Sequence, residues 1–187
     1  MPAILRGKCI IVGDSGVGKS SVCQVFHSDG AHFPKNYTMN TAVEMMVKSV
    51  NIPDTQDSVE IFMYDSAGKE IFTESVMKFW DQPSMVVVVY DVTSETSFSS
   101  CVKWLERVRS HKPDVQMPGV LLANKIDLDQ RRTVSPKAGK DLAMSHNLEY
   151  FECSAKEMQN VDTAFYYLAN EFHKIYQERV LLFKSLS

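Results

Sequence analysis

The feature that most constrains the fold of this chain is the segment Gly13–Ser20, GDSGVGKS, which matches the pattern GxxxxGK[ST]. It directly follows Lys8–Val12, an apolar run typical of a strand buried on both faces. Glycines tolerate positive φ, so successive backbone N–H groups can point at phosphate oxygens while a following helix adds positive potential. We therefore expect a strand, a phosphate-binding loop and then a helix that reaches about Phe26. A glycine turn with a solvated lysine is the alternative.

Short runs rich in Val, Ile and Phe alternate with stretches of helical spacing along the rest of the chain, which predicts an α/β domain. The expected strands are Lys8–Val12, Val43–Val50, Ser58–Asp65, Met85–Tyr90, Gly119–Ala123 and Tyr150–Cys153. Further helices are expected over Ser94–His111, from Ser135 and Pro136 to about His146, and from Val161 to about residue 184. The turn NIPDTQD predicts that the second and third strands pair antiparallel. The expectation is one domain over residues 1–187, with a mostly parallel six-stranded sheet flanked by helices.

Composition excludes several classes of function. With 20 Lys and Arg against 23 Asp and Glu, the formal charge is −3, which provides no basic field for nucleic acid. The four cysteines form no CxxC pair, which argues against a disulfide framework or a zinc site. The apolar run Met85–Tyr90 is far shorter than the roughly twenty residues of a membrane span. We expect a soluble protein of the cytosol.

The loop and a second motif together predict a phosphate and magnesium site. Backbone N–H groups from Ser15 onward would face phosphate oxygens, with Lys19 near the β and γ phosphates. The Ser20 hydroxyl is placed to ligate Mg²⁺. The motif DSAG comes at the end of a predicted strand, so we predict that Asp65 is the acidic residue of the magnesium site. The Gly68 N–H is predicted to sense a γ phosphate. A carboxylate that only caps the next helix is the alternative for Asp65.

The motif Asn124-Lys125-Ile126-Asp127 also ends a predicted strand. The Asp127 carboxylate offers acceptors only, which match the N1–H and N2 amine donors of guanine. Adenine would leave this carboxylate desolvated and unpaired. The aliphatic part of Lys125 can lie over the base, and Asn124 can tie this loop to the Gly13 loop. By itself the motif could be a turn with a helix cap.

The order of GDSGVGKS, DSAG, NKID and CSAK along the chain resembles the Ras-like small GTPases, which have a P-loop NTPase fold of the Ras-like G-domain type. The resemblance implies GTP and GDP binding with Mg²⁺, and a last guanine loop at Ser154, Ala155 and Lys156. It also implies that Phe33 packs beside guanine. The full set of nucleotide-binding residues expected on these grounds is Ser15, Gly16, Val17, Gly18, Lys19, Ser20, Ser21, Phe33, Gly68, Asn124, Lys125, Asp127, Ser154, Ala155 and Lys156.

A narrower resemblance concerns the Rab branch of that family. YDVT followed by SF and WLE looks like Rab proteins, and SDGAHF, NIPDTQDSVEIFMYDSAGKE and EFHKIYQERVLLFKSL look like the Rab-like GTPases of intraflagellar transport complex B. This likeness implies a nucleotide-dependent switch in the cytoplasm, in the cilium or flagellum and at its base. The implied partners are a small β-sandwich intraflagellar transport subunit, in a heterodimer, and the larger B complex.

Three departures from the family pattern modify these expectations. Lys69 stands where most members carry a glutamine that orients the attacking water, and an ammonium has no lone pair to accept a proton. In the first switch, counting from Ser20 selects Thr38 as the magnesium ligand, whereas the following strand selects Asn40, which we prefer, with Thr41 adjacent. No cysteine follows Cys153 and residue 2 is proline, so we expect no lipid anchor.

Two functional classes remain open from the sequence. One is a slow GTP hydrolase with Lys69 at the water-positioning site, and the other is a nucleotide-stabilised structural subunit that rarely cleaves GTP. A nucleoside or nucleotide kinase shares the Gly13 loop, but NKID argues against it. The apolar cluster Val180–Phe183 near the terminus predicts a protein partner there, or packing on the sheet edge.

Overall fold

The computed structural model describes residues 2–34, 42–113, 115 and 117–186, and within them a six-stranded sheet with the order β2-β3-β1-β4-β5-β6. The strands are β1 (Ile4–Val12), β2 (Val43–Asn51), β3 (Ser58–Ser66), β4 (Met85–Asp91), β5 (Gly119–Asn124) and β6 (Glu149–Glu152). Only the β2–β3 pair of this sheet is antiparallel, and the other four pairs are parallel. The predicted α/β class and the predicted hairpin are confirmed.

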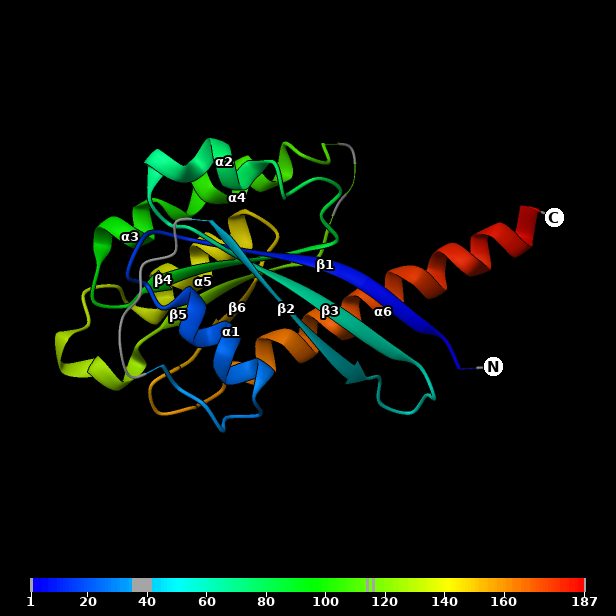
Figure 1. Ribbon diagram of the computed structural model, residues 1–187, viewed down its shortest axis with the longest axis horizontal. Helices are drawn as coiled ribbons and strands as arrows, with labels where there is room; N and C mark the ends of the chain where they lie inside the picture. The colour runs from blue at the N-terminus through cyan, green and yellow to red at the C-terminus, as the bar shows by residue number, and fades with distance from the viewer. Residues whose placement is uncertain (1, 35–41, 114, 116, 187) are drawn as a thin grey trace.

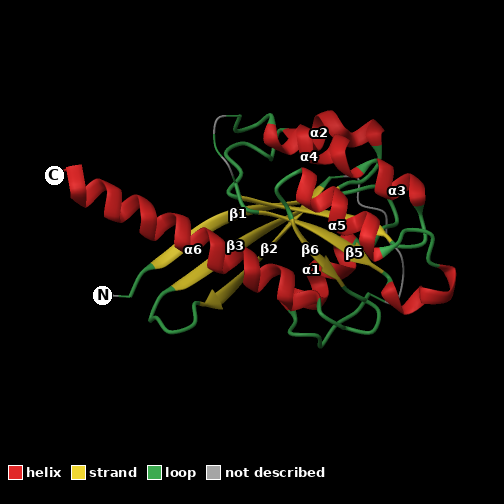
Figure 2. Cartoon of the chain, turned by 180° about the vertical axis from the view of Figure 1, so that it is seen from behind, coloured by secondary structure: helices red, strands yellow, loops and turns green. Residues whose placement is uncertain are grey.

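Helices cover both faces of the sheet (Figures 1 and 2). One face carries α1 (Lys19–His27) and α6 (Val161–Leu186), and Phe26 of α1 stacks on Phe165 of α6. The other face carries α2 (Thr73–Met77), α3 (Glu95–Ser99), α4 (Cys101–Arg109) and α5 (Pro136–Ser145). The valines of β4 alternate between the two core clusters, since successive side chains of a strand point to opposite faces. This explains why all seven residues of β4 are buried.

Local chemistry explains where two of the described helices begin. Ser135 caps α5 by accepting a hydrogen bond from the Ala138 N–H at 3.2 Å, and Pro136 occupies the first turn, as the sequence predicts. The single helix expected over Ser94–His111 is instead divided into α3 and α4 at Ser100. Ser94 caps α3, because its side chain accepts a hydrogen bond from the Ser97 N–H.

At the amino ends of the parallel strands, β1 and β3 extend further than β4. β1 begins at Ile4, four residues before its predicted start, because it pairs with β3 from Ile4 opposite Ser58 onward. β4 begins only opposite Cys9 of β1. The strands β1 and β3 therefore extend past β4, and the second half of α6 runs out beside them (Figure 1). No helix in the described ranges is long and apolar enough to cross a membrane.

Candidate functional site

The predicted site residues lie in loops at one edge of the sheet. The carboxyl ends of parallel strands meet at the same edge, which is where ligand crevices of α/β folds open. At this edge β1 leads into Gly13 and β6 leads into Cys153. Asp65, Asp91 and Asn124 lie in the last two residues of β3, β4 and β5.

Lys19 occupies the centre of the Gly13 loop. Its side chain is buried, and its Nζ donates hydrogen bonds to the backbone carbonyls of Gly13 and Asp14, both at 2.9 Å. Burial lowers the pKa of the Lys19 ammonium, and the nearby carboxylates of Asp65 and Asp14 oppose that shift. The ammonium is thus held in the loop by dipoles, and its full charge is available to an anion there.

Two glycines allow other loops to approach the phosphate loop closely. Gly18 has φ +99°, a left-handed backbone, and a Cβ built there would lie 2.4 Å from the Asn124 amide nitrogen. A Cβ on Gly68 would lie 2.5 Å from Lys19 Nζ and 2.6 Å from the Gly13 oxygen. Gly68 therefore lies directly over the loop, where a γ-phosphate sensor is expected.

Ser20 and Asp65 come together as the magnesium prediction requires. The Ser20 hydroxyl donates a hydrogen bond of 2.5 Å to Asp65 Oδ2, across 45 residues of sequence. Asp65 is fully buried at the end of β3, so its carboxylate is held next to Lys19 and Ser20. A hydroxyl and a carboxylate are hard oxygen donors, which fit Mg²⁺. Residues 35–41, and with them Thr38, Asn40 and Thr41, lie outside the described residues.

Asn124 joins three loops at the other half of the site. Its Nδ2 donates to the Val17 carbonyl at 2.9 Å, and its Oδ1 accepts from the Ala155 N–H at 3.1 Å. Its buried amide is thus used on both sides, and the phosphate loop, the NKID loop and the CSAK loop are held in a fixed relation. The predicted tie between Asn124 and the Gly13 loop is present.

Asp127 lies in a short 3₁₀ helix, Ile126–Arg131, and faces the CSAK loop. Ser154 Oγ donates to Asp127 Oδ1 at 2.6 Å, and Lys156 Nζ lies 3.9 Å from Asp127 Oδ2. The same Ser154 oxygen accepts from the Glu157 N–H at 3.0 Å. One side of the carboxylate is therefore oriented by Ser154, as the residue sets predicted from NKID and CSAK require.

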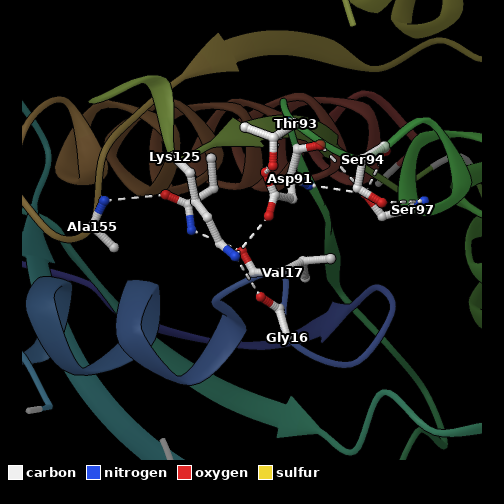
Figure 3. Close-up of polar contacts among 9 residues, drawn as sticks. Gly16, Val17, Asp91, Thr93, Ser94, Ser97, Lys125 and Ala155 are labelled. Atoms are coloured by element: carbon white, nitrogen blue, oxygen red, sulfur yellow. Dashed lines mark hydrogen bonds and ion pairs between the residues drawn. The ribbon is translucent and has the colours of Figure 1, made fainter. Parts of the chain in front are cut away.

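Asp91 is a site residue that sequence reasoning missed. Its Oδ2 forms an ion pair of 2.6 Å with Lys125 Nζ, which also donates to the Gly16 carbonyl at 2.7 Å (Figure 3). Burial opposes ionisation of Asp91, but hydrogen bonds from Lys125 and Thr93 outweigh it, so its pKa lies below the usual value. Asp91 ends β4 as Asp65 ends the predicted strand Ser58–Asp65, and that shared position was the signal that could have found it.

Trp104 is a second missed residue, with no local signal in the sequence. Its indole Nε1 donates to Asp14 Oδ1 at 2.8 Å and so ties α4 to the phosphate loop. Trp80 packs edge-on against Trp104 and donates to Ser66 Oγ at 2.8 Å, one residue beyond Asp65. Both indoles therefore brace the phosphate half of the site from the α4 face.

Lys69 and Phe33 lie away from the site's hydrogen bonds. Lys69 is exposed, and its backbone carbonyl accepts a hydrogen bond from the Phe72 N–H at 3.0 Å, whereas its side chain makes no hydrogen bond or ion pair with another described residue. Phe33 is half-buried and packs against the core cluster on the α1 and α6 face. Their roles in hydrolysis and in guanine packing stay predictions.

Comparison with known proteins identifies the family. The Ras family model matches residues 8–174. The chain is 49% identical over 183 residues to the human Intraflagellar transport protein 27 homolog, covering 98% of both chains. It is 38% identical to Intraflagellar transport protein 27 of Chlamydomonas reinhardtii, covering 97% of this chain and 91% of that one. It is also 32% identical to Ras-related protein Rab-10 of Caenorhabditis elegans, over 87% of this chain and 78% of that one. The chain with this phosphate loop and these three companion motifs therefore belongs to the Ras family of small GTPases.

Proposed function

We propose that the chain, as one small GTPase domain over residues 1–187, binds GTP and GDP with Mg²⁺ in the site at the carboxyl edge. The observation that carries this proposal is the Asn124 amide, which holds the phosphate loop through Val17 and the CSAK loop through Ala155. These contacts support a single site with a phosphate-binding half and a base-binding half. Asp127, an acceptor-only group, selects guanine.

The residues present fit a magnesium nucleotide. Ser20 and Asp65 would hold Mg²⁺, which neutralises charge on the phosphates when it is bound. Lys19 contributes a fixed positive charge inside the loop, and Gly68 packs against Lys19 and the Gly13 carbonyl, which supports a role for its N–H in sensing a γ phosphate. Loss of that contact after hydrolysis would release the segment that follows Gly68.

Hydrolysis is proposed to be very slow. A glutamine side chain has both a donor and an acceptor and can orient an attacking water. Lys69 is exposed, and its ammonium has no lone pair, so it cannot accept a proton from that water. The same observation favours a second candidate, a structural subunit that keeps its nucleotide and rarely cleaves it. In both cases guanine nucleotide stabilises the fold by binding only the native state.

The relatives also support a proposal about the cellular role. Because the human and Chlamydomonas relatives are named intraflagellar transport protein 27, we infer that this chain is a subunit of intraflagellar transport complex B in the cytoplasm, the cilium or flagellum and its base. The inferred direct partner is a small β-sandwich subunit of that complex, in a heterodimer. Leu181, Leu182 and Phe183 support a contact at the end of α6, since they are 65%, 62% and 76% exposed.

The test is to purify the chain, denature it and identify the released nucleotide, and then to follow single-turnover cleavage of bound GTP. Guanine nucleotide at about one equivalent per chain, with Mg²⁺-dependent retention, is the expected result. A Lys19→Ala variant is the control, because it removes the charge in the loop. Release of adenine nucleotide, or equal binding of ATP and GTP, would overturn the proposal. Measurable cleavage of GTP would support the slow hydrolase, and retention of uncleaved GTP would support the structural subunit.

A further inference from the structure

The second half of α6 has two opposite sides with different surroundings. On one side, Phe172 packs toward Gly7 of β1, and His173 and Gln177 lie against Asp57. The other side carries Glu171, Lys174, Ile175 and Glu178, at helical spacing. This side faces a groove of about 500 Å³ between α6, the end of α5 and the starts of β5 and β6. The groove is the candidate binding surface.

Several of the side chains that line the groove are apolar. Met144 at the end of α5 is 75% exposed, which is unusual for a side chain of this size and apolarity. Leu148, Ile175 and Tyr167 are half-buried around it. A partner side chain that enters the groove would remove these apolar atoms from water.

The rim of the groove is acidic. Glu149 and Glu178 are exposed and make no ion pair with any other residue in the described part of the chain. Glu171 is offset by Lys174 at 4.0 Å. The pKa of the Tyr167 hydroxyl is raised, first by burial and then by the charges of Glu171 and Glu149, which indicates negative potential inside the groove. Two carboxylates are thus available to a cationic partner.

The wall formed by α6 determines which kind of backbone can bind. Residues 167–178 of α6 extend for about 16 Å along the groove, and a helix surface offers side chains and no free backbone groups. An extended strand laid there would leave its N–H and C=O groups without partners in the interface, whereas a helix satisfies its own. The side-chain rows of a bound helix can also interdigitate with the side-chain rows of α6.

We propose that this groove is a docking site for an amphipathic helix of a partner protein, with an apolar stripe against Met144 and Ile175 and Lys or Arg side chains facing Glu149 and Glu178. The proposal goes beyond guanine nucleotide binding and uses residues other than the exposed Leu181–Phe183 cluster. The groove lies at the amino ends of β5 and β6, whereas the nucleotide site lies at their carboxyl ends. Its affinity for the helix is therefore the same in the GDP and GTP states.

The probe is a pair of fluorescein-labelled alanine-rich helical peptides with leucines at i, i+3, i+4 and i+7. Lysines flank the stripe in one peptide and glutamates flank it in the other. Fluorescence anisotropy against the full chain with GDP should show at least about tenfold tighter binding of the lysine peptide, with the difference reduced by salt. In the variant Glu149→Lys with Glu178→Lys, the glutamate peptide should bind more tightly instead. Met144→Ser should weaken the lysine peptide about threefold or more.

Matched variants separate this site from general charge effects. Glu74→Lys with Glu106→Lys changes the net charge by the same amount as Glu149→Lys with Glu178→Lys, but at exposed glutamates of α2 and α4. This control should still bind the lysine peptide more tightly than the glutamate peptide. Met45→Ser, at an exposed methionine of β2, is the control for Met144→Ser. Equal binding of the two peptides to the native chain, or a preference that Glu149→Lys with Glu178→Lys leaves unchanged, would overturn the proposal. A change of preference in the α2 and α4 control would do the same.

Discussion

Asn124 shows how one side chain can hold three loops in a fixed relation. Its amide is buried, and it donates to Val17 and accepts from Ala155, residues 107 positions before it and 31 after it. A buried amide that loses either partner leaves a polar group unpaired, at a cost of about 1–3 kcal/mol. Asn124 therefore fixes the geometry of the loops around it.

Asp127 is expected to determine base selectivity. Asp127→Asn replaces one acceptor with a donor, so GTP affinity should fall at least about tenfold. Xanthine nucleotide, which carries a carbonyl where guanine carries the amine, should gain relative to GTP. Competition between GTP, XTP and ATP for a fluorescent GDP analogue measures the change. A variant whose GTP preference matches the native chain would show that the base is read elsewhere.

Lys69 is expected to limit hydrolysis. Small GTPases with the glutamine turn over unaided at on the order of 10⁻⁴ s⁻¹, so this chain should be at or below that rate. Lys69→Gln should raise the single-turnover rate, and Lys69→Ala is the control that removes the ammonium without adding an amide. A native rate near 1 s⁻¹ would mean that another residue positions the water. Equal rates in the glutamine and alanine variants would show that the amide does not act.

At the scale of elements, Asp57 connects three segments that are far apart in sequence. It lies in the turn between β2 and β3, where Oδ1 accepts from the Ala3 N–H at 2.7 Å and Oδ2 lies 2.8 Å from His173 Nε2. The Gln177 amide approaches the same oxygen at 3.5 Å. One carboxylate thus joins the β2–β3 hairpin, the start of β1 and the second half of α6.

This arrangement makes a pH-dependent contribution to stability. The pKa of Asp57 lies below its usual value of 3.8, first because of the Ala3 N–H and then because of His173. A lowered folded-state pKa adds stability above the unfolded pKa, and that stability is lost as pH falls through the folded value. Thermal unfolding should therefore show a lower Tm for Asp57→Asn than for the native chain at neutral pH, with the two converging at acidic pH. Asp54→Asn, in the same turn, is the control and should follow the native profile. Parallel native and Asp57→Asn profiles would contradict this.

At the scale of the whole molecule, the two ends of the sheet are specialised differently. The carboxyl edge gathers the loops of the proposed nucleotide site, and at the amino end β1, β3 and α6 extend beyond β4. Leu181–Phe183 lie at the far end of this extension and are exposed. A partner bound there would leave the nucleotide loops accessible.

The proposed heterodimer can be tested at this extension. Leu182→Glu with Phe183→Glu should weaken binding of the small β-sandwich subunit at least about tenfold, because charges would be buried without partners, while guanine nucleotide binding is retained. Ile71→Glu with Phe79→Glu adds the same charges to exposed apolar residues on either side of α2 in the sequence and should leave the heterodimer intact. Titration calorimetry with GDP and with a GTP analogue should give equal affinities. If the terminal variant holds the subunit as tightly as the native chain, the interface lies elsewhere.

The sequence by itself was sufficient for the order of the strands along the chain, the fold class and the meeting of the four motifs. The physical reason is that each motif follows a run with strand character, and parallel strands bring their carboxyl ends to one edge regardless of the intervening loops. Helix caps such as Ser135 were also readable, because a cap depends on neighbouring residues only. The division of the expected helix into α3 and α4 at Ser100 could not be predicted from the sequence. The apolar spacing continues through Ser100, and its backbone stays close to helical at φ −77° and ψ −13°.

Only the tertiary structure decided the contacts that join the motifs to the rest of the fold. Trp104 meets Asp14 across 90 residues, and His173 meets Asp57 across 116, and neither pair has a local pattern that indicates it. The length of β1 was decided in the same way, because Ile4–Gly7 become a strand through pairing with Ser58–Ile61. Local chemistry selects the loop that binds phosphate, whereas side chains distant in sequence acquire partners only when the packed sheet and helices place them within hydrogen-bond distance.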